Sequence, residues 1–140
     1  MSVSFNQFDV FLDDLTSGKH DFNTQTFFVY LSNQIPQKAH KLKSQLAEIT
    51  PGFGYLAGGN QMITSKHDVL GVVTVFGTNV QFTAQNGTIG PFQYAVLYNT
   101  NGGLLIGWWD YGGTLVLNPT EAFTVVLNPT LGLFEIERTS

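Results

Sequence analysis

The chain has 140 residues, of which 43% are hydrophobic, 14% aromatic and only 11% charged, and its formal net charge is −4. This length suits one core, so we expect a single domain over residues 1–140, with a helical segment at 1–22 and a β body at 23–140. The acidic balance argues against a nucleic-acid partner, and the lack of cysteine excludes disulfides and thiolate metal sites.

The first predicted element is a short amphipathic helix over residues 5–16. Its apolar side chains recur at spacings of three and four residues, which lines one face of a helix: Phe5, Phe8, Leu12 and Leu15. Ser4 with Gln7 three residues later has the form of a capping box, and Gly18 suits a left-handed exit from the helix.

Two further elements precede the main β region. Thr26–Leu31 is dense in β-branched and aromatic residues and too short for a helix, which predicts a strand. Lys41–Ile49 predicts a second short helix that ends before Pro51.

From Gly58 onward the turn signals arrive every eight to twelve residues, a spacing typical of sandwiches and barrels. The predicted strands are Gln61–Thr64, Leu70–Phe76, Asn79–Ala84, Phe92–Tyr98, Leu104–Asp110, Thr114–Leu117, Phe123–Leu127 and Leu133–Glu137. The whole pattern predicts an all-β fold, a jelly-roll-like β-sandwich of about eight strands with a short N-terminal helix.

No motif in the chain predicts catalysis, a cofactor or a metal. The ten carboxylates show no marked pair of the kind that a glycosidase needs. His20, His40 and His67 lie too far apart for a metal-binding motif. We therefore expect no enzyme activity, and a small glycan-active enzyme is the less favoured of the alternatives.

The most distinctive run contains Trp108 and Trp109 beside Asp110. Neighbouring residues of a strand point to opposite faces, so we expect one tryptophan in the core and the other exposed. An exposed tryptophan suits a protein interface or stacking on a sugar, and the core and interface readings are favoured over sugar binding.

A second candidate surface joins the N-terminal segment with a basic stretch. Phe5, Phe8 and Phe11 lie in a terminus that we expect to be mobile enough to reach a neighbour. Three of only six cationic side chains gather in a short stretch that either steers an acidic partner or forms a solvated helix start: Lys38, Lys41 and Lys43.

Three segments together resemble the small cement, or decoration, proteins of tailed bacteriophage capsids, such as those of short-tailed Bordetella phages: Gly52–Gly59, Ile89–Tyr98 and Leu105–Gly112. The resemblance implies a jelly-roll protein on the virion exterior, assembled in the cytoplasm of the host bacterium, that binds the major capsid protein and clamps neighbouring capsomers. It implies no catalytic residues.

The expected function is therefore capsid cementing, and the alternative is a carbohydrate- or receptor-binding module of a phage tail or head appendage. The low charged fraction and the aromatic strands also predict association of the chain with itself, as a dimer or a trimer. No long apolar run is present, so we expect no membrane partner.

Overall fold

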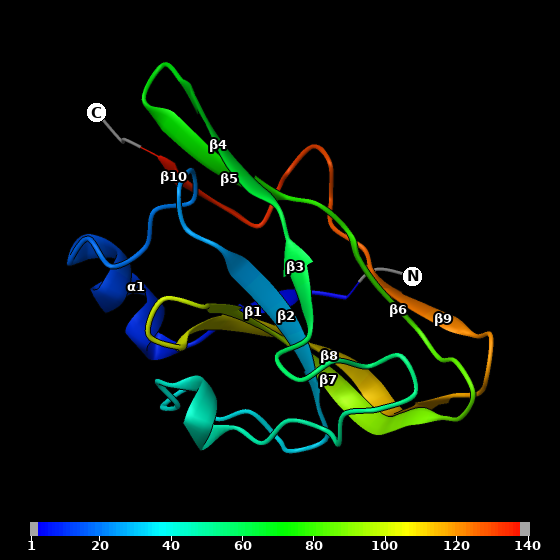
Figure 1. Ribbon diagram of the computed structural model, residues 1–140. Helices are drawn as coiled ribbons and strands as arrows, with labels where there is room; N and C mark the ends of the chain where they lie inside the picture. The colour runs from blue at the N-terminus through cyan, green and yellow to red at the C-terminus, as the bar shows by residue number, and fades with distance from the viewer. Residues whose placement is uncertain (1–2, 138–140) are drawn as a thin grey trace.

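A computed structural model describes residues 3–137 of the chain, which form mainly antiparallel β-sheet (Figure 1). The elements in chain order are β1 (Phe5–Gln7), α1 (Asp9–Thr16), β2 (Phe27–Ser32), the 3-10 helix η1 (Lys43–Gln45), β3 (Asn60–Met62), β4 (Thr64–Val69), β5 (Val72–Gly77), β6 (Val80–Thr83), β7 (Ile89–Asn99), β8 (Leu104–Leu117), β9 (Ala122–Val125) and β10 (Phe134–Glu137). The prediction of an all-β, sandwich-like fold with a short helix is confirmed.

The largest sheet has five strands in the order β1-β8-β7-β2-β3, with the β7–β8 hairpin at its centre. A three-stranded sheet (β10-β5-β4) and a two-stranded sheet (β6-β9) complete the fold. Only Ile63 separates β3 from β4, so one extended segment passes from the largest sheet into the three-stranded one. In Figure 1 the hairpin of β4 and β5 projects from the body at the top.

The five-stranded sheet is covered on both faces. One face joins the main core with Val29 and Trp109, and the other joins a second cluster with Tyr30 and Trp108. Strands that are buried on both faces are apolar without alternation. This explains why β2 consists of an almost unbroken run of buried residues.

The N-terminal helix begins later than predicted. Residues 5–7 form β1, which pairs with β8 through Phe5 opposite Trp109, so the helix covers only Asp9–Thr16. Phe8 is its N-cap and provides no side-chain cap, so the predicted capping box of Ser4 and Gln7 is wrong. Gly18 has the expected left-handed conformation, with φ of 77°.

The second predicted helix, Lys41–Ile49, is mostly wrong, because only the 3-10 helix η1 forms there. Leu42 makes an isolated β-bridge to Leu104, which holds the backbone extended at the start of this segment. The carbonyl oxygen of Leu46 accepts a hydrogen bond from the Tyr30 hydroxyl at 2.9 Å. The segment therefore lies against the sheet as an irregular cover.

Most predicted strands are found with shifted ends. β1 and β4 were not predicted as strands. The two strands expected on either side of Gly112-Gly113 are one continuous strand of 14 residues, β8.

Candidate interaction surface

The two tryptophans point to opposite faces of β8, as predicted, but both are buried. Trp109 is 3% exposed and packs on Phe5 with ring centroids 4.9 Å apart. Trp108 is 9% exposed and packs on Phe8 at 4.6 Å. The expectation that one tryptophan is exposed is therefore wrong, because the N-terminal segment supplies an aromatic cover for each face. Neither ring is open for stacking on a sugar.

The N-terminal phenylalanines form part of the fold and do not present a mobile contact. Phe8 is 1% exposed and Phe11 is fully buried, while Phe5 is half-buried within β1. The prediction that this segment reaches a neighbouring molecule through these rings is wrong for Phe8 and Phe11, since burying large aromatic side chains in the core is the more favourable use of them.

The three lysines of the basic stretch differ from one another. Lys38 and Lys41 are exposed. Lys43 Nζ lies 2.9 Å from Glu48 Oε1 and 4.7 Å from the centroid of the Tyr30 ring. Lys43 is therefore held by an ion pair and a cation–π contact, which leaves Lys38 and Lys41 as the more available cations of the stretch, while its place in an interface stays a prediction.

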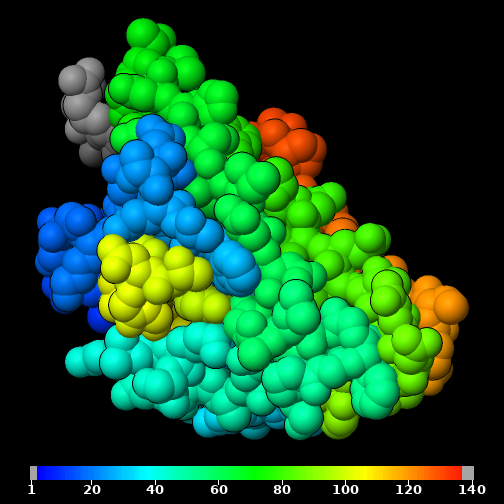
Figure 2. Space-filling view, viewed as in Figure 1, coloured from blue at the N-terminus to red at the C-terminus, as the bar shows by residue number. Residues whose placement is uncertain are grey.

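The structure nevertheless brings the two predicted contact segments together. The backbone N–H of Asp9 donates to the carbonyl of Lys38 at 2.9 Å, and the N–H of Leu105 donates to Lys41 at 3.0 Å. In Figure 2 the helix (blue), the turn near residue 102 (yellow) and the stretch around Lys41 (cyan) lie next to one another at one end of the molecule.

We call this end the α1–Lys38 surface and define it by its exposed side chains: Asp9, Leu12, Asp13, Lys38, Lys41 and Leu42. Leu12 is 58% exposed and Leu42 is 40% exposed. The surface combines both signs of charge with apolar contact area, a mixture found in protein interfaces.

A network around Glu48 fastens the segment that carries these lysines onto the sheet. Glu48 Oε2 accepts hydrogen bonds from the Tyr55 hydroxyl and from the N–H of Gly58, both at 2.6 Å. The Tyr55 hydroxyl in turn accepts from the N–H of Leu31 at 3.1 Å. The Glu48 carboxylate thus links Lys43, Tyr55 and Gly58 to one another, and the Tyr55 hydroxyl links them to strand β2.

The tyrosines of this network act as neutral donors. Burial, followed by the hydrogen bond to Glu48, raises the pKa of Tyr55, and burial together with the charge of Glu48 raises the pKa of Tyr30 and Tyr98. A phenol that keeps its proton holds a hydrogen bond but is a poor nucleophile or base. The arrangement therefore suits a structural role.

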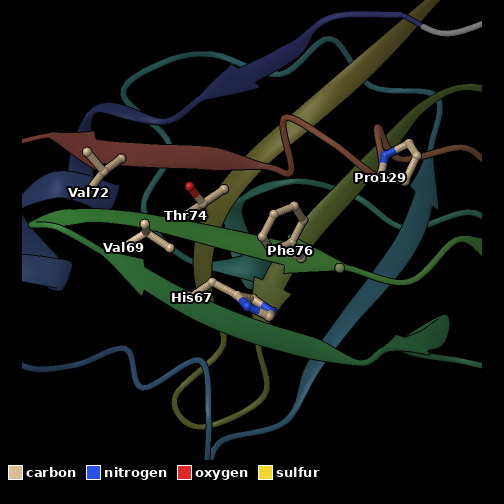
Figure 3. Close-up of a pocket in the computed structure, with 7 residues that line it drawn as sticks. His67, Val69, Val72, Thr74, Phe76 and Pro129 are labelled. Atoms are coloured by element: carbon tan, nitrogen blue, oxygen red, sulfur yellow. The ribbon is translucent and has the colours of Figure 1, made fainter.

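The most exposed large apolar side chain among the described residues, Leu70, lies on the projecting hairpin, which sequence reasoning missed. Leu70 at its tip is 96% exposed and Val69 beside it is 65% exposed. An open groove of about 580 Å³ runs along the same hairpin (Figure 3). It is lined by His67, Val69, Val72, Thr74, Phe76, Gly77 and Pro129. The signal that could have found the hairpin is Leu70-Gly71 between two valines.

Asp14 of α1 and His20 in the loop after it are buried polar residues, at 2% and 7% exposure. Asp14 Oδ1 lies 3.4 Å from Lys19 Nζ, and His20 Nδ1 lies 3.1 Å from Asn99 Nδ2. The His20 ring packs against the ring of Phe11 at 5.5 Å. Burial lowers the pKa of His20 from its ordinary value of 6.5, and the charge of Asp14 opposes this only in part.

The lowered pKa of His20 predicts a loss of stability in mild acid. Because the unfolded chain binds this proton more tightly than the folded chain, the free energy of unfolding should be highest above pH 6.5 and should fall as the pH drops below that value. Urea titrations between about pH 5 and pH 8 measure this slope. His20→Gln should flatten it. An unchanged slope in His20→Gln would contradict the assignment.

Among residues 3–137, no group of three or more metal-ligating side chains is placed to hold an ion. Within the same residues, no helix has both the length and the apolar character needed to cross a membrane. Comparison with known proteins finds no matching family model, no matching curated protein and no matching solved structure.

Proposed function

We propose that this chain is a structural virion protein, a cement protein that binds the outside of a bacteriophage capsid and clamps neighbouring copies of the major capsid protein. The motifs that resemble phage cement proteins support the proposal. The observation that carries it is the α1–Lys38 surface, because the hydrogen bond from Asp9 to Lys38 joins two distant segments into one exposed, mixed-charge contact area.

The capsid contact is formed by many modest interactions. Each copy needs only a small interface with the shell, because repetition over a closed lattice multiplies weak contacts. Lys38 and Lys41 attract acidic groups of the capsid, while Leu12 and Leu42 provide the apolar part of the contact. A carbohydrate-binding role depended on an exposed tryptophan and loses that support.

Charge removal on this surface should weaken capsid binding. We expect Lys38→Gln with Lys41→Gln to lower the affinity for capsids that lack the protein about tenfold at low salt, with a smaller difference at high salt, because exposed charges are screened. Co-sedimentation of the protein with purified shells measures the affinity. The matched control is Gln85→Glu with Thr114→Glu, which changes the net charge by the same two units at exposed positions elsewhere.

The role itself is tested with capsids that lack the protein. They should rupture at a lower temperature than complete capsids, and adding back the unaltered chain should restore their resistance. If bare and complete capsids resist heat equally, the cement proposal is overturned. If the Lys38 and Lys41 variant binds as well as its control, the α1–Lys38 surface is not the contact.

A further inference from the structure

Strand β4 forms a free edge of the three-stranded sheet. Its other edge pairs with β5 over its whole length, and in the part of the chain that the structure describes no strand pairs with the outer side of β4. Residues 65–69 are all exposed. A free edge carries a row of backbone donors and acceptors that fit another strand.

The hairpin turn determines which backbone groups face outward. Val69 pairs with Val72 across the two-residue turn, and Leu70 and Gly71 both have positive φ, at 52° and 83°. Residues that flank such a turn bond to each other, so Val69 and every second residue before it face β5. The N–H of Thr78 donates to the carbonyl of Ile63 at 3.0 Å, which continues this alternation. The backbone groups of Lys66 and Asp68 therefore point to the free edge.

Charge selects one register for pairing with a second copy of the same strand. An antiparallel pair centred on Lys66 or on Asp68 would place like charges opposite each other, which is unfavourable. A pair centred on His67 places Lys66 of one copy opposite Asp68 of the other, twice by symmetry. Sliding one strand past the other by a single residue would place outward-facing backbone groups opposite inward-facing ones, and the hydrogen bonds between the strands would be lost.

The same register covers the apolar tip of the hairpin. It sets Val69 opposite Ser65 of the second copy and Leu70 opposite Thr64. The left-handed φ of Leu70 is costly for a bulky side chain, and asparagine or glycine is favoured at this position of the turn. Leu70 is 96% exposed in the single chain, and contact with a second copy would bury this apolar side chain.

We propose that two copies of this chain pair edge to edge through β4, antiparallel and centred on His67, so that their three-stranded sheets join into one. Thr64 marks the limit of the pairing, because its hydroxyl donates to the carbonyl of Phe22 at 2.8 Å and the 21–23 loop lies beside it. The pairing uses a different part of the chain from the α1–Lys38 surface and does not depend on the proposed capsid role.

Charge reversal and charge exchange test this register. The unaltered chain should sediment as a dimer at micromolar concentration. Lys66→Asp alone and Asp68→Lys alone each place two pairs of like charges opposite each other, and should raise the dissociation constant roughly tenfold or more. The double variant restores opposite charges and should recover the dimer. Asp21→Asn is the control. It removes a charge that interacts with Lys66, but Asp21 is not part of the β4 pairing, so the dimer should stay intact.

Two further variants separate pairing from folding. Lys66→Pro removes an outward N–H without removing a bond to β5, so the chain should fold but stay monomeric. Leu70→Asn should weaken the dimer and raise the melting temperature of the monomer by roughly 2–6 °C, since it relieves the strained turn.

A monomeric unaltered chain at high micromolar concentration would overturn the proposal, and so would a dimer that ignores both charge reversals. If both reversals weaken the dimer and the exchange does not restore it, the His67-centred register is wrong. Capsid binding by the monomeric variants is a separate readout, so that failure of the dimer does not bear on the cement role.

Discussion

Phe11→Ala should destabilise the chain by about 3–5 kcal/mol, the range for removing a fully buried aromatic side chain. Phe11 is fully buried, and its ring lies 5.1 Å from Phe134 and 6.3 Å from Phe22. The substitution would open a cavity where α1, the following loop and β10 meet. Because the surrounding rings come from two segments, the loop after α1 and β10, they cannot collapse into that space without moving the backbone. Urea unfolding followed by tryptophan fluorescence measures the loss.

Leu12→Ala is the matched control for this prediction. Leu12 is the next residue of the same helix and is 58% exposed, so its truncation should cost less than about 1 kcal/mol. Equal losses for the two variants would contradict the orientation of α1 on the sheet. The comparison also separates burial of Phe11 from an interface role, because truncation of an exposed Phe11 would cost little stability.

Glu48→Ala should destabilise the chain by about 2–4 kcal/mol, because it leaves one buried donor and one partly buried donor without an acceptor. The hydroxyl of Tyr55, a residue that is 1% exposed, loses its acceptor. The N–H of Gly58 also loses its acceptor, and Lys43 loses its counter-ion. The covering segment that carries Lys38 and Lys41 should then loosen. Amide hydrogen exchange over residues 40–59 should rise, and the melting temperature should fall.

Two variants apportion this effect. Glu48→Gln keeps one acceptor oxygen and should lose less than Glu48→Ala. Lys43→Met removes the ion pair but leaves both bonds to Glu48 Oε2, and should cost about 1 kcal/mol or less because the pair is partly exposed. If Lys43→Met proves as harmful as Glu48→Ala, the ion pair outweighs the hydrogen bonds and the account of the network is wrong.

The buried strands could be predicted from the sequence, whereas the exposed edge could not. β2 is a run of apolar and aromatic residues because both of its faces are covered, and such runs are recognisable. β4 reads Thr-Ser-Lys-His-Asp-Val and is exposed along nearly its whole length. It has no apolar alternation for a pattern to detect, and only its pairing with β5 makes it a strand. For the same reason, the exposed surface of the β4–β5 hairpin could not be predicted.

The sequence suggested candidate contact residues by their type, but it did not indicate which of their side chains are buried. Residue alternation correctly placed Trp108 and Trp109 on opposite faces, but the sequence does not show that Phe8 and Phe5 cover them. In the sequence Lys43 cannot be distinguished from Lys38 and Lys41, but in the structure it forms an ion pair with Glu48, five residues later. Which side chains are free depends on packing and ion pairing in the folded chain, both local and long-range, which spacing patterns alone do not contain.

The pairing of β1 with β8 also orders events during synthesis. Asn6 and Trp108, opposite each other in this pair, are 102 residues apart in the chain. Contacts of such separation form slowly, because the intervening loop must be closed before they contribute. On the ribosome, the first residues therefore emerge long before their partner strand exists, and their phenylalanines stay unprotected until β8 has been made. A chaperone that shields the nascent N-terminal segment would have its largest effect on the yield of this chain during that interval.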